Sequence, residues 1–377
     1  PRVSCVVTCY SEGEDVRKTI QSLAQQLYPG HIEIIAVIDG AIQNRPTLLA
    51  ARNARRLLAG QAKRNLVVLP KWQRGGRVSS LNAGLSIATG EIVMALDGDT
   101  SFDNDMVVNV VRHFQDPDVP AVAGSLRVRN ARASLTTAMQ ALEYLLSIQL
   151  AKIGLSEWNV VNNVSGAFGA FRRSFLQKIG GWDTHTAEDL DITLRIKNYF
   201  GRRPLRIPFE PRAIGHTDAP VTFRQFLMQR LRWDGDLFFL YVRKHRHSFT
   251  PRLLGWPNFL VVLVSGFFFQ LVLPFIILGY FIVGLYSLTL STFLVLAWLV
   301  YLVYLANTLL AYVVAVCMVS ERPRQDLWLC WVVPLFPLFM FVMRCWSAVA
   351  ILNEMIRRGH EETSMAPWWV LRKAKRF

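Results

Sequence analysis

The first hundred residues alternate between short apolar runs and longer segments with helical spacing. Four runs rich in β-branched or apolar residues predict buried strands, at 3–8, 32–38, 66–69 and 91–96. Apolar stripes predict helices between them, at 14–27, 46–58 and 78–87. Strands that alternate with helices form βαβ units, so we expect a mostly parallel sheet with right-handed crossovers. Ligands of such sheets bind beyond the carboxyl ends of the strands, where we therefore look for chemistry.

The last third of the chain has a different pattern, which indicates membrane-spanning helices. No Asp, Glu, Lys or Arg occurs in the 68 residues from Leu253 to Ser320, whereas one span needs about 20 apolar residues. Residues 258–286 and 291–319 are each long enough to span, and 327–352, which contains Arg344, is a third candidate. We divide the chain into a soluble domain (1–235), a basic interfacial linker (236–256), transmembrane or interfacial helices (257–356) and a basic tail (357–377).

Composition supports this division and limits the classes of binding partner that we expect. Of the 377 residues, 52% are hydrophobic and 18% are charged, against about 25% charged in typical soluble domains. This composition excludes a disordered chain and argues against a purely soluble protein. The net charge of +15 is consistent with attraction to anionic lipid, with a nucleotide or polyanionic ligand, or with both. We find no helix-turn-helix, zinc-finger or RRM pattern, so we expect no nucleic-acid partner.

The topology of the third apolar segment stays open. Three spans after a cytosolic domain would place the basic tail outside, whereas the positive-inside rule places it in the cytosol. A third segment that is re-entrant or lies on the membrane surface would reconcile the two. Arg344 indicates either a polar cavity or a contact between helices.

Polar residues follow every predicted strand of the soluble part. They are Tyr10, Ser11 and Glu12; Asp39 and Gly40; Lys71, Arg74 and Arg77 around Gly75-Gly76; and Asp97-Gly98-Asp99. Carboxylates beside guanidinium groups suit a nucleotide diphosphate with a divalent ion, and two Asp flanking a Gly can bind Mg²⁺ or Mn²⁺. Each piece alone has a simpler reading, because acidic turns and solvated basic loops are common.

A second cluster lies between residues 165 and 191. The stretch SGAFGAFRR from Ser165 to Arg173 has small residues that permit close approach of a bulky ligand, or that form a tight turn in the core. Glu188 and Asp189 begin a predicted helix. There they either stabilise the helix N-terminus or include a carboxylate that acts as a general base.

The sequence QRLRW supplies a third group of candidates. Arg232 can bind phosphate oxygens through two N–H groups, and Trp233 offers a flat face for a sugar ring. The alternative is an amphipathic helix on the membrane, with Trp at the interface. Both readings are compatible, because the first apolar segment starts about twenty residues later.

Taken in order, these motifs resemble those of family 2 inverting glycosyltransferases. The narrower resemblance is to membrane-embedded processive synthases of poly-N-acetylglucosamine, chitin oligosaccharides, hyaluronan and cellulose. It covers residues 1 to 233 and rests on TCYSE, IDG, a basic GG loop, DGD, SGAFGAFRR, AED and QxxRW. The resemblance implies an α/β GT-A-like, Rossmann-like domain with a mostly parallel sheet, followed by C-terminal transmembrane helices. Departures include Cys9 and Ser11 for Pro and Asn, Arg77 for Lys, and DGA for DDGS.

The resemblance also implies roles for individual residues. Tyr10, Glu12 and Asp39 would hold the uridine, Arg77 would lie near the diphosphate, and Asp97 would contact the nucleotide. Asp99 would bind Mg²⁺ or Mn²⁺, and Asp189 would be the catalytic base with Glu188 beside it. Gln229, Arg232 and Trp233 would close over the pyrophosphate and the acceptor end, with Ser165, Gly166 and Phe168 in the acceptor region.

We therefore expect an enzyme that uses a UDP-sugar donor, favouring UDP-N-acetylglucosamine and then UDP-glucose. It would extend a β-linked polysaccharide or oligosaccharide acceptor with inversion and export the product across the bilayer. The expected location is a bacterial inner membrane, with the catalytic domain in the cytosol. The alternatives are a single-transfer enzyme acting on a lipid or lipid-linked acceptor and, less favoured, an inactive receptor or scaffold. The sequence does not specify an oligomeric state.

Overall fold

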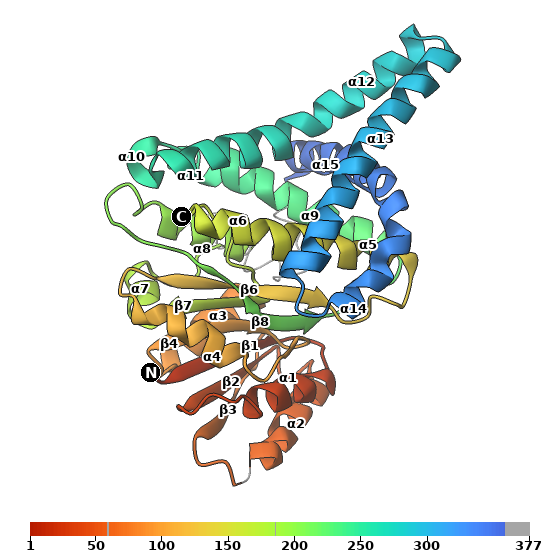
Figure 1. Cartoon of the computed structure of the whole chain (residues 1–377). Coiled ribbons are helices and arrows are strands. Elements are labelled where there is room, and N and C mark those ends of the chain that lie inside the picture. The colour runs from red at the N-terminus through yellow and green to blue at the C-terminus, as the bar shows by residue number, and fades with distance from the viewer. Residues whose placement is uncertain (59, 185, 359–377) are drawn as a thin grey trace.

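The computed structural model describes residues 1–58, 60–184 and 186–358. Its first part is built on one mixed β-sheet, and its last part is a group of long helices (Figure 1). Helices α5, α6, α8 and α9 lie between the sheet and the C-terminal helices. Nearly all of the predicted basic tail lies outside the described residues.

The four predicted strands are present and form one parallel half of the sheet, in the order β3-β2-β1-β4. They are β1 (Val3–Cys9), β2 (Ile32–Asp39), β3 (Arg64–Lys71) and β4 (Ile92–Asp97). Strand β3 is longer than its apolar run because it lies at the sheet edge, where most of its residues are only half-buried.

The second half of the sheet has mixed directions. It contains β5 (Ser101–Phe102), β6 (Ala121–Val128), β7 (Phe168–Arg172) and β8 (Phe209–Thr217). Strand β7 is antiparallel to both β4 and β6, and β8 is parallel to β6. Strands β4, β6 and β8 therefore run in the same direction as β1, β2 and β3. The carboxyl ends of all six strands lie along one edge of the sheet. The sheet is mostly parallel, as predicted.

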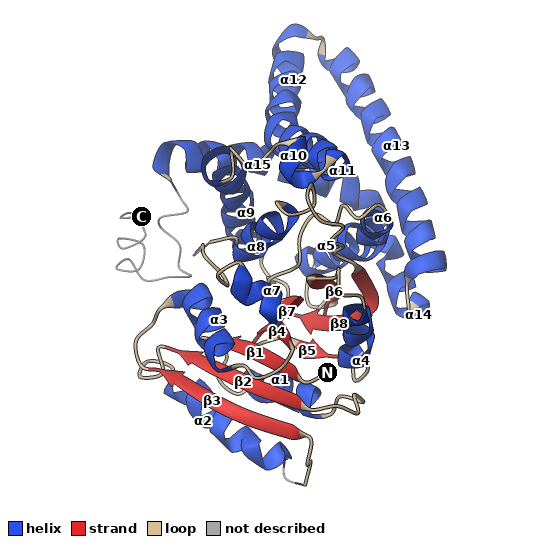
Figure 2. Cartoon of the chain, turned by 90° about the vertical axis from the view of Figure 1, so that its left-hand side faces the viewer, coloured by secondary structure: helices blue, strands red, loops and turns tan. Residues whose placement is uncertain are grey.

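Helices cover both faces of the sheet (Figure 2). One core packs α1 and α2 against the sheet, and the other packs α3, α6, α7 and α8. The helices are α1 (Asp15–Ala24), α2 (Arg45–Asn53), α3 (Gly76–Ile87), α4 (Met106–Val111), α5 (Leu135–Tyr144), α6 (Ala151–Glu157), α7 (Arg173–Lys178), α8 (Glu188–Lys197) and α9 (Phe223–Phe238). Short 3₁₀ helices follow α2 and α4, at Ala54–Leu58 and Arg112–Gln115, and the π-helical turn Leu145–Leu150 joins α5 to α6. Helix α1 ends earlier than predicted because the Leu27 N–H donates to the Asn104 carbonyl, 2.7 Å away.

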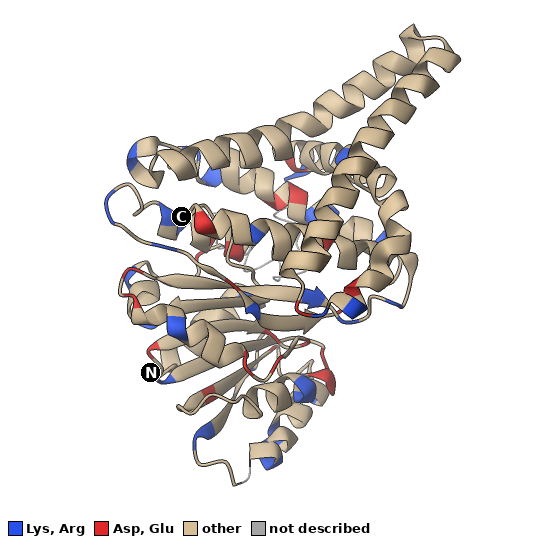
Figure 3. Ribbon diagram, viewed as in Figure 1, with Lys and Arg blue, Asp and Glu red and all other residues tan. Residues whose placement is uncertain are grey.

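Three helices are long and apolar enough to cross a membrane: Trp256–Ser287, Leu290–Val319 and Pro323–Arg357. They comprise α11 (Trp256–Val261), α12 (Leu273–Ser287), α13 (Leu290–Val314), α14 (Pro323–Asp326) and α15 (Phe336–Arg357), with Val262–Val272, Ala315–Val319 and Leu327–Leu335 as π or 3₁₀ turns. The π turn Phe239–Lys244 and the short α10 (Pro251–Leu254) precede them. Helices α12 and α13 project from the body and carry no charged residue (Figure 3).

The third segment is one helical run of 35 residues, with Pro334 inside its 3₁₀ stretch Leu327–Leu335. Arg344 in this run donates to the Phe269 carbonyl at 3.1 Å and to Gln270 Oε1 at 3.2 Å. Its guanidinium group therefore bonds to the first candidate span, which places a polar contact between two helices. Helix α5 packs against the second and third candidate spans.

Candidate active site

Arg77 is the junction of the candidate site, because its guanidinium group contacts four separate segments. Its Nη1 donates to Thr8 Oγ1 at 2.9 Å and to Asp97 Oδ1. Its Nε donates to Glu188 Oε1 at 2.5 Å, and its Nη2 donates to the Gly166 carbonyl at 2.5 Å. The ends of β1 and β4, the segment before β7 and the start of α8 are thus held together. A side chain at Gly166 would have its Cβ only 3.0 Å from Glu188 Oε1, so glycine allows this approach.

The predicted base Asp189 lies beside this junction in the first turn of α8. Asp189 Oδ2 accepts hydrogen bonds from Asn163 Nδ2 at 3.1 Å and from the Gly166 N–H at 3.2 Å. Asp189 Oδ1 accepts from its own neighbour, the Leu190 N–H, at 2.8 Å. Burial and the negative charge of Glu188 raise the pKa of Asp189, while these hydrogen bonds oppose the rise. A half-buried carboxylate with a raised pKa suits proton abstraction near neutral pH.

Asp39 anchors the basic loop that follows β3. Its Oδ1 accepts from Lys71 Nζ and from the Gly75 N–H, both at 2.8 Å. Its Oδ2 accepts from the Gly76 N–H at 2.8 Å, and Gly76 has a φ of +83°, which favours glycine. A carboxylate has about four acceptor positions. One position on Oδ2 therefore remains for a donor such as the N–H of a uracil ring.

Tyr10 and Glu12 flank the same edge of the sheet. The Arg74 guanidinium lies 4.1 Å from the centre of the Tyr10 ring, which forms a flat surface beside the basic loop. Glu12 Oε2 is buried and has no hydrogen-bond partner among the described residues. Burial raises the pKa of Glu12, and the negative charge of Asp99 adds to the rise. Such a carboxylate is poised to accept a hydrogen bond or to bind a cation.

The carboxylates at the end of β4 fit a divalent ion shared with a ligand. Asp99 is exposed, and its Oδ1 accepts a hydrogen bond from the Thr100 hydroxyl at 3.2 Å. In the part of the chain that the structure describes, no group of three or more His, Cys, Asp or Glu could hold a metal alone. Mg²⁺ is usually bound by one or two carboxylates plus substrate phosphates. Asp99, with Glu12 beside it, fits that donor set if a diphosphate completes the coordination.

Helix α9 brings the QxxRW motif against helix α5. Gln229 Oε1 accepts from Gln140 Nε2 at 3.1 Å. Arg230, between the motif residues, pairs with Glu143 of α5 at 2.5 Å, and its guanidinium lies 4.7 Å from the Trp233 ring centre. Trp233 is 36% exposed. Arg232 makes no ion pair within residues 1–58, 60–184 and 186–358, so its donors are available to a ligand.

The predicted acceptor residues divide between site and core. Gly166 is part of the Arg77 junction, and the Ser165 carbonyl accepts from the Phe168 N–H at 3.2 Å in the preceding turn. The Phe168 side chain is fully buried and packs edge-to-face on Phe102, with ring centres 5.4 Å apart. We therefore correct the expectation for Phe168, because its side chain supports the sheet and does not face an acceptor.

Three buried charged residues near the site were missed by the sequence analysis. Lys152 is 3% exposed and donates to the Asn163 carbonyl at 3.0 Å, beneath the residue that bonds Asp189. Burial lowers the pKa of Lys152 to about 8, against the attraction of the Asp189 charge. Burial raises the pKa of Asp236 to about 7 on the same helix as Arg232. A charged residue within an apolar helical stripe, as in the sequence LAKIG around Lys152, is the signal that could have found them.

Asp191, the third of these residues, fixes helix α8 to the segment after α9. Asp191 Oδ1 is 2.8 Å from both His245 Nε2 and Lys244 Nζ, and its Oδ2 is 2.9 Å from Arg195 Nε. Its carboxylate is fully buried, which opposes ionisation. The His245 hydrogen bond and the charges of Lys244 and Arg195 outweigh burial and lower the pKa of Asp191 to about 2.

Comparison with known proteins agrees with this architecture. Residues 1–235 match the family described as "Glycosyltransferase like family 2". The poly-beta-1,6-N-acetyl-D-glucosamine synthase of Staphylococcus epidermidis is 30% identical over 235 residues, covering 61% of this chain and 53% of that protein. The Staphylococcus aureus (strain COL) protein of the same name is 28% identical over 233 residues, with the same coverage. The chain thus spans about half the length of the curated relatives it matches.

A solved structure shares the fold. It is the mannosyltransferase PcManGT from Pyrobaculum calidifontis, in complex with GDP-Man and Mn²⁺. The TM-score is 0.60 at 18% identity, over 95% of this chain and 88% of that one. The chain belongs to glycosyltransferase family 2. It is a glycosyltransferase with a GT-A-like domain and a helical C-terminal region that contains three candidate membrane spans.

Proposed function

We propose that this glycosyltransferase extends a β-linked polysaccharide from a UDP-sugar, with UDP-N-acetylglucosamine favoured and UDP-glucose next. The observation that carries the proposal is the Arg77 junction, which holds Asp97, Gly166 and Glu188 around one guanidinium group beside Asp189. This geometry supports Asp189 as the base, beside the edge of the sheet at which we propose that the nucleotide binds. The identity of 30% and 28% with poly-beta-1,6-N-acetyl-D-glucosamine synthases supports the donor and the product class.

The site residues divide the work of a single displacement. Asp189 accepts the proton of the acceptor hydroxyl as its oxygen attacks the anomeric carbon, on the face opposite UDP. The bond to UDP breaks, so an α-linked donor gives a β-linked product. A Mg²⁺ or Mn²⁺ ion bound at Asp99 would neutralise charge on the departing diphosphate. Arg232 binds the diphosphate oxygens, and Asp39 and Tyr10 hold the uridine at the other end of the donor.

The candidate spans support a place for the protein in a membrane, with the catalytic domain in the cytosol, where nucleotide sugars are made. Helices α5 and α9 both contact the C-terminal helices, so an acceptor leaving the site would meet them directly. This packing supports export of the growing product through or along these helices. It also favours the alternative acceptor, a lipid or lipid-linked sugar, which would enter from the same side.

The test uses the full chain in purified membranes with a panel of UDP-sugars and Mg²⁺ or Mn²⁺. UDP release identifies the donor, and product size separates a polymer from the single-sugar product of the alternative. Asp189→Asn should lower kcat by about 10²–10⁴-fold while UDP affinity changes less than about threefold. Glu157→Gln, an exposed position on α6, is the matched control and should retain activity. Normal turnover by Asp189→Asn, or no UDP release from any donor, would overturn the proposal.

A further inference from the structure

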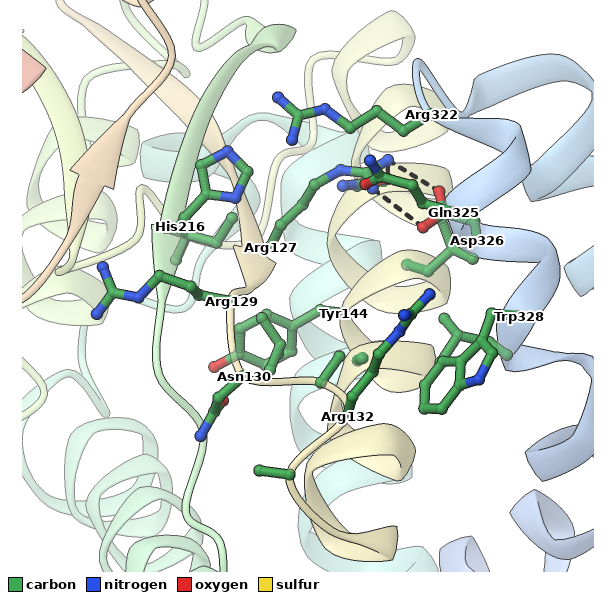
Figure 4. A pocket seen from close by; sticks show the side chains of 18 residues that line it. Arg127, Arg129, Asn130, Arg132, Tyr144, His216, Arg322, Gln325, Asp326 and Trp328 are labelled. Carbon is green, nitrogen blue, oxygen red and sulfur yellow. Dashed lines mark hydrogen bonds and ion pairs between the residues drawn. The ribbon is translucent and has the colours of Figure 1, made fainter.

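A cavity of about 570 Å³ lies beside the active site, outside the residues that the proposed transfer uses. It opens between the end of β6, helix α5 and the segment that joins the second and third candidate spans. In Figure 4, Arg129 and His216 lie on one side, and Arg127 reaches across to Asp326 on the other; Arg322 lies above that ion pair, and Arg132 lies below it beside Trp328. Its lining contains four arginines and one carboxylate, so positive charge predominates there.

The four arginines differ in how they are paired. The buried Asp326 accepts from Arg127 Nη1 and Nη2 at 3.0 and 2.9 Å, which ties β6 to helix α14. Arg322 Nη2 donates to Asp103 Oδ2 at 2.7 Å and leaves its other N–H donors available. Arg132 is exposed and has no ion pair among the described residues, and its guanidinium lies 5.2 Å from the Trp328 ring centre. Arg132 and Arg322 are therefore the cations that a ligand can bind.

The position of the cavity indicates which class of ligand it can bind. Trp328 and Arg322 flank the start of the third candidate span, Pro323–Arg357. Trp is enriched at the boundary between membrane and water, and arginine binds phosphate through two parallel N–H groups. We propose that this cavity binds the phosphate-bearing headgroup of an anionic lipid, with its phosphate on Arg132, its apolar part against Trp328, and Arg322 adding positive charge at the other end of the cavity. The acyl chains would extend along the apolar helices.

The cavity shares a wall with the metal-binding turn that the sequence predicts. Arg129 Nη2 donates to the Asp99 carbonyl at 3.1 Å, and its Nη2 and Nε also bond both oxygens of Asp218, at 2.7 and 3.0 Å. A headgroup in the cavity therefore lies one residue layer from the proposed transfer centre. Phosphate is the shared chemistry of a lipid headgroup and of free phosphate or pyrophosphate, and the experiment separates these sources.

Binding is measured on the purified full chain in detergent at about 0.15 M salt, without sugar nucleotide or metal. The result is therefore independent of the proposed transferase activity. The probes are dioctanoyl phosphatidic acid, dioctanoyl phosphatidylcholine and inorganic pyrophosphate, followed by isothermal titration calorimetry. The zwitterionic lipid should bind at least about tenfold more weakly than phosphatidic acid, because its choline cation is repelled by the arginines and cancels the negative charge of its phosphate.

Arg132→Gln should weaken phosphatidic acid binding about fivefold, and Arg132→Gln with Arg322→Gln at least about tenfold. Arg322→Gln removes one partner of Asp103, which keeps its bond to His216 at 2.9 Å. Thermal unfolding checks that the single and the double variant both fold. Arg324→Gln is the matched control, because Arg324 is exposed on helix α14, two residues after Arg322, and does not line the cavity. Its affinity should stay within about twofold of wild type.

Three results would overturn the proposal. Unchanged affinity in the folded double variant would remove the cavity as the site. An equal loss in Arg324→Gln would mean that diffuse surface charge, and not the cavity, attracts the lipid. Pyrophosphate binding as tight as that of phosphatidic acid would overturn the lipid as the source and assign the cavity to a soluble phosphate.

Discussion

Replacing Arg77 by glutamine should destabilise the soluble domain, because one guanidinium group neutralises two carboxylates there. The side chains of Arg77 and Glu188 are each 11% exposed, and that of Asp97 is 30% exposed. Glutamine removes the positive charge and cannot reach all four partners. The two carboxylates would then face each other, together with Asp189, without a cation bonded between them.

The size of the effect follows from burial. Removing one partner of a buried ion pair costs about 3–5 kcal/mol, because the other charge stays buried. Water near the partly exposed Asp97 screens its share, so we expect the lower end, about 3 kcal/mol. For a domain of 150–250 residues, 1 kcal/mol shifts Tm by about 2–4 °C, which gives a loss of roughly 6–12 °C. Arg77→Lys keeps the positive charge but makes fewer hydrogen bonds, so its Tm should fall by about half as much as that of Arg77→Gln.

The assay is thermal unfolding of the full chain in detergent, followed by tryptophan fluorescence at pH 7.5 and pH 5. Acid protonates the unpaired carboxylates, so the deficit of Arg77→Gln should shrink at pH 5. Arg56→Gln, on the exposed side of a 3₁₀ turn, is the control and should change stability by less than about 0.5 kcal/mol. A Tm within 2 °C (about the error of the assay) of wild type, or a deficit equal at both pH values, would refute this reasoning.

Three further predictions concern other buried or metal-facing charges. Lys152→Met should move the acid limb of the kcat/KM–pH profile up by about one unit, because a positive charge that favours ionised Asp189 is lost; Lys152→Arg should restore the limb. Asp191→Asn should lower the free energy of unfolding in urea by about 3 kcal/mol at pH 7. Because the pKa of Asp191 is about 2 in the fold and about 3.9 when unfolded, the wild-type contribution persists above about pH 4 and is lost as the pH falls toward 2. Asp99→Asn should weaken UDP binding at least tenfold with Mn²⁺ present but little with EDTA, as measured by calorimetry.

The parallel half of the sheet could be predicted because its strands are buried and local. Strands β1, β2 and β4 carry continuous apolar runs; β1 and β2 are each followed by a predicted helix, and β4 is preceded by one. The antiparallel half could not be predicted in the same way. Strand β7 inserts between β4 and β6, and that pairing depends on contacts about 50 to 80 residues away in the sequence. Its short sequence, FGAFR, fits a turn as well as a strand.

The site shows the same limit. Motif order placed Asp39, Asp97 and Asp99 at strand ends, which is local information. It did not show that both oxygens of Asp39 bond to the loop after β3, because that contact joins residues 32 to 37 positions apart. Phe168 was assigned to the acceptor because its motif is rich in small residues. The sheet closes around its ring because Gly124 of β6, which lies outside that motif, is directly against it.

The contacts of helix α9 indicate that the C-terminal helices take part in shaping the active site. Asp234 accepts from Ser347 Oγ at 2.6 Å, and the Leu227 carbonyl accepts from Trp346 Nε1 at 2.8 Å. Both partners lie on α15, within the third candidate span. The residues beside Asp234 on α9 are Arg232 and Trp233, so a shift of α15 would move the groups that we propose close over the diphosphate. Asp191 and Asp189 both lie on α8. Asp191 bonds Lys244 and His245, which follow α9, and so holds α8 to that segment. A displacement of the membrane-facing helices would therefore reach the base and the diphosphate-binding residues together.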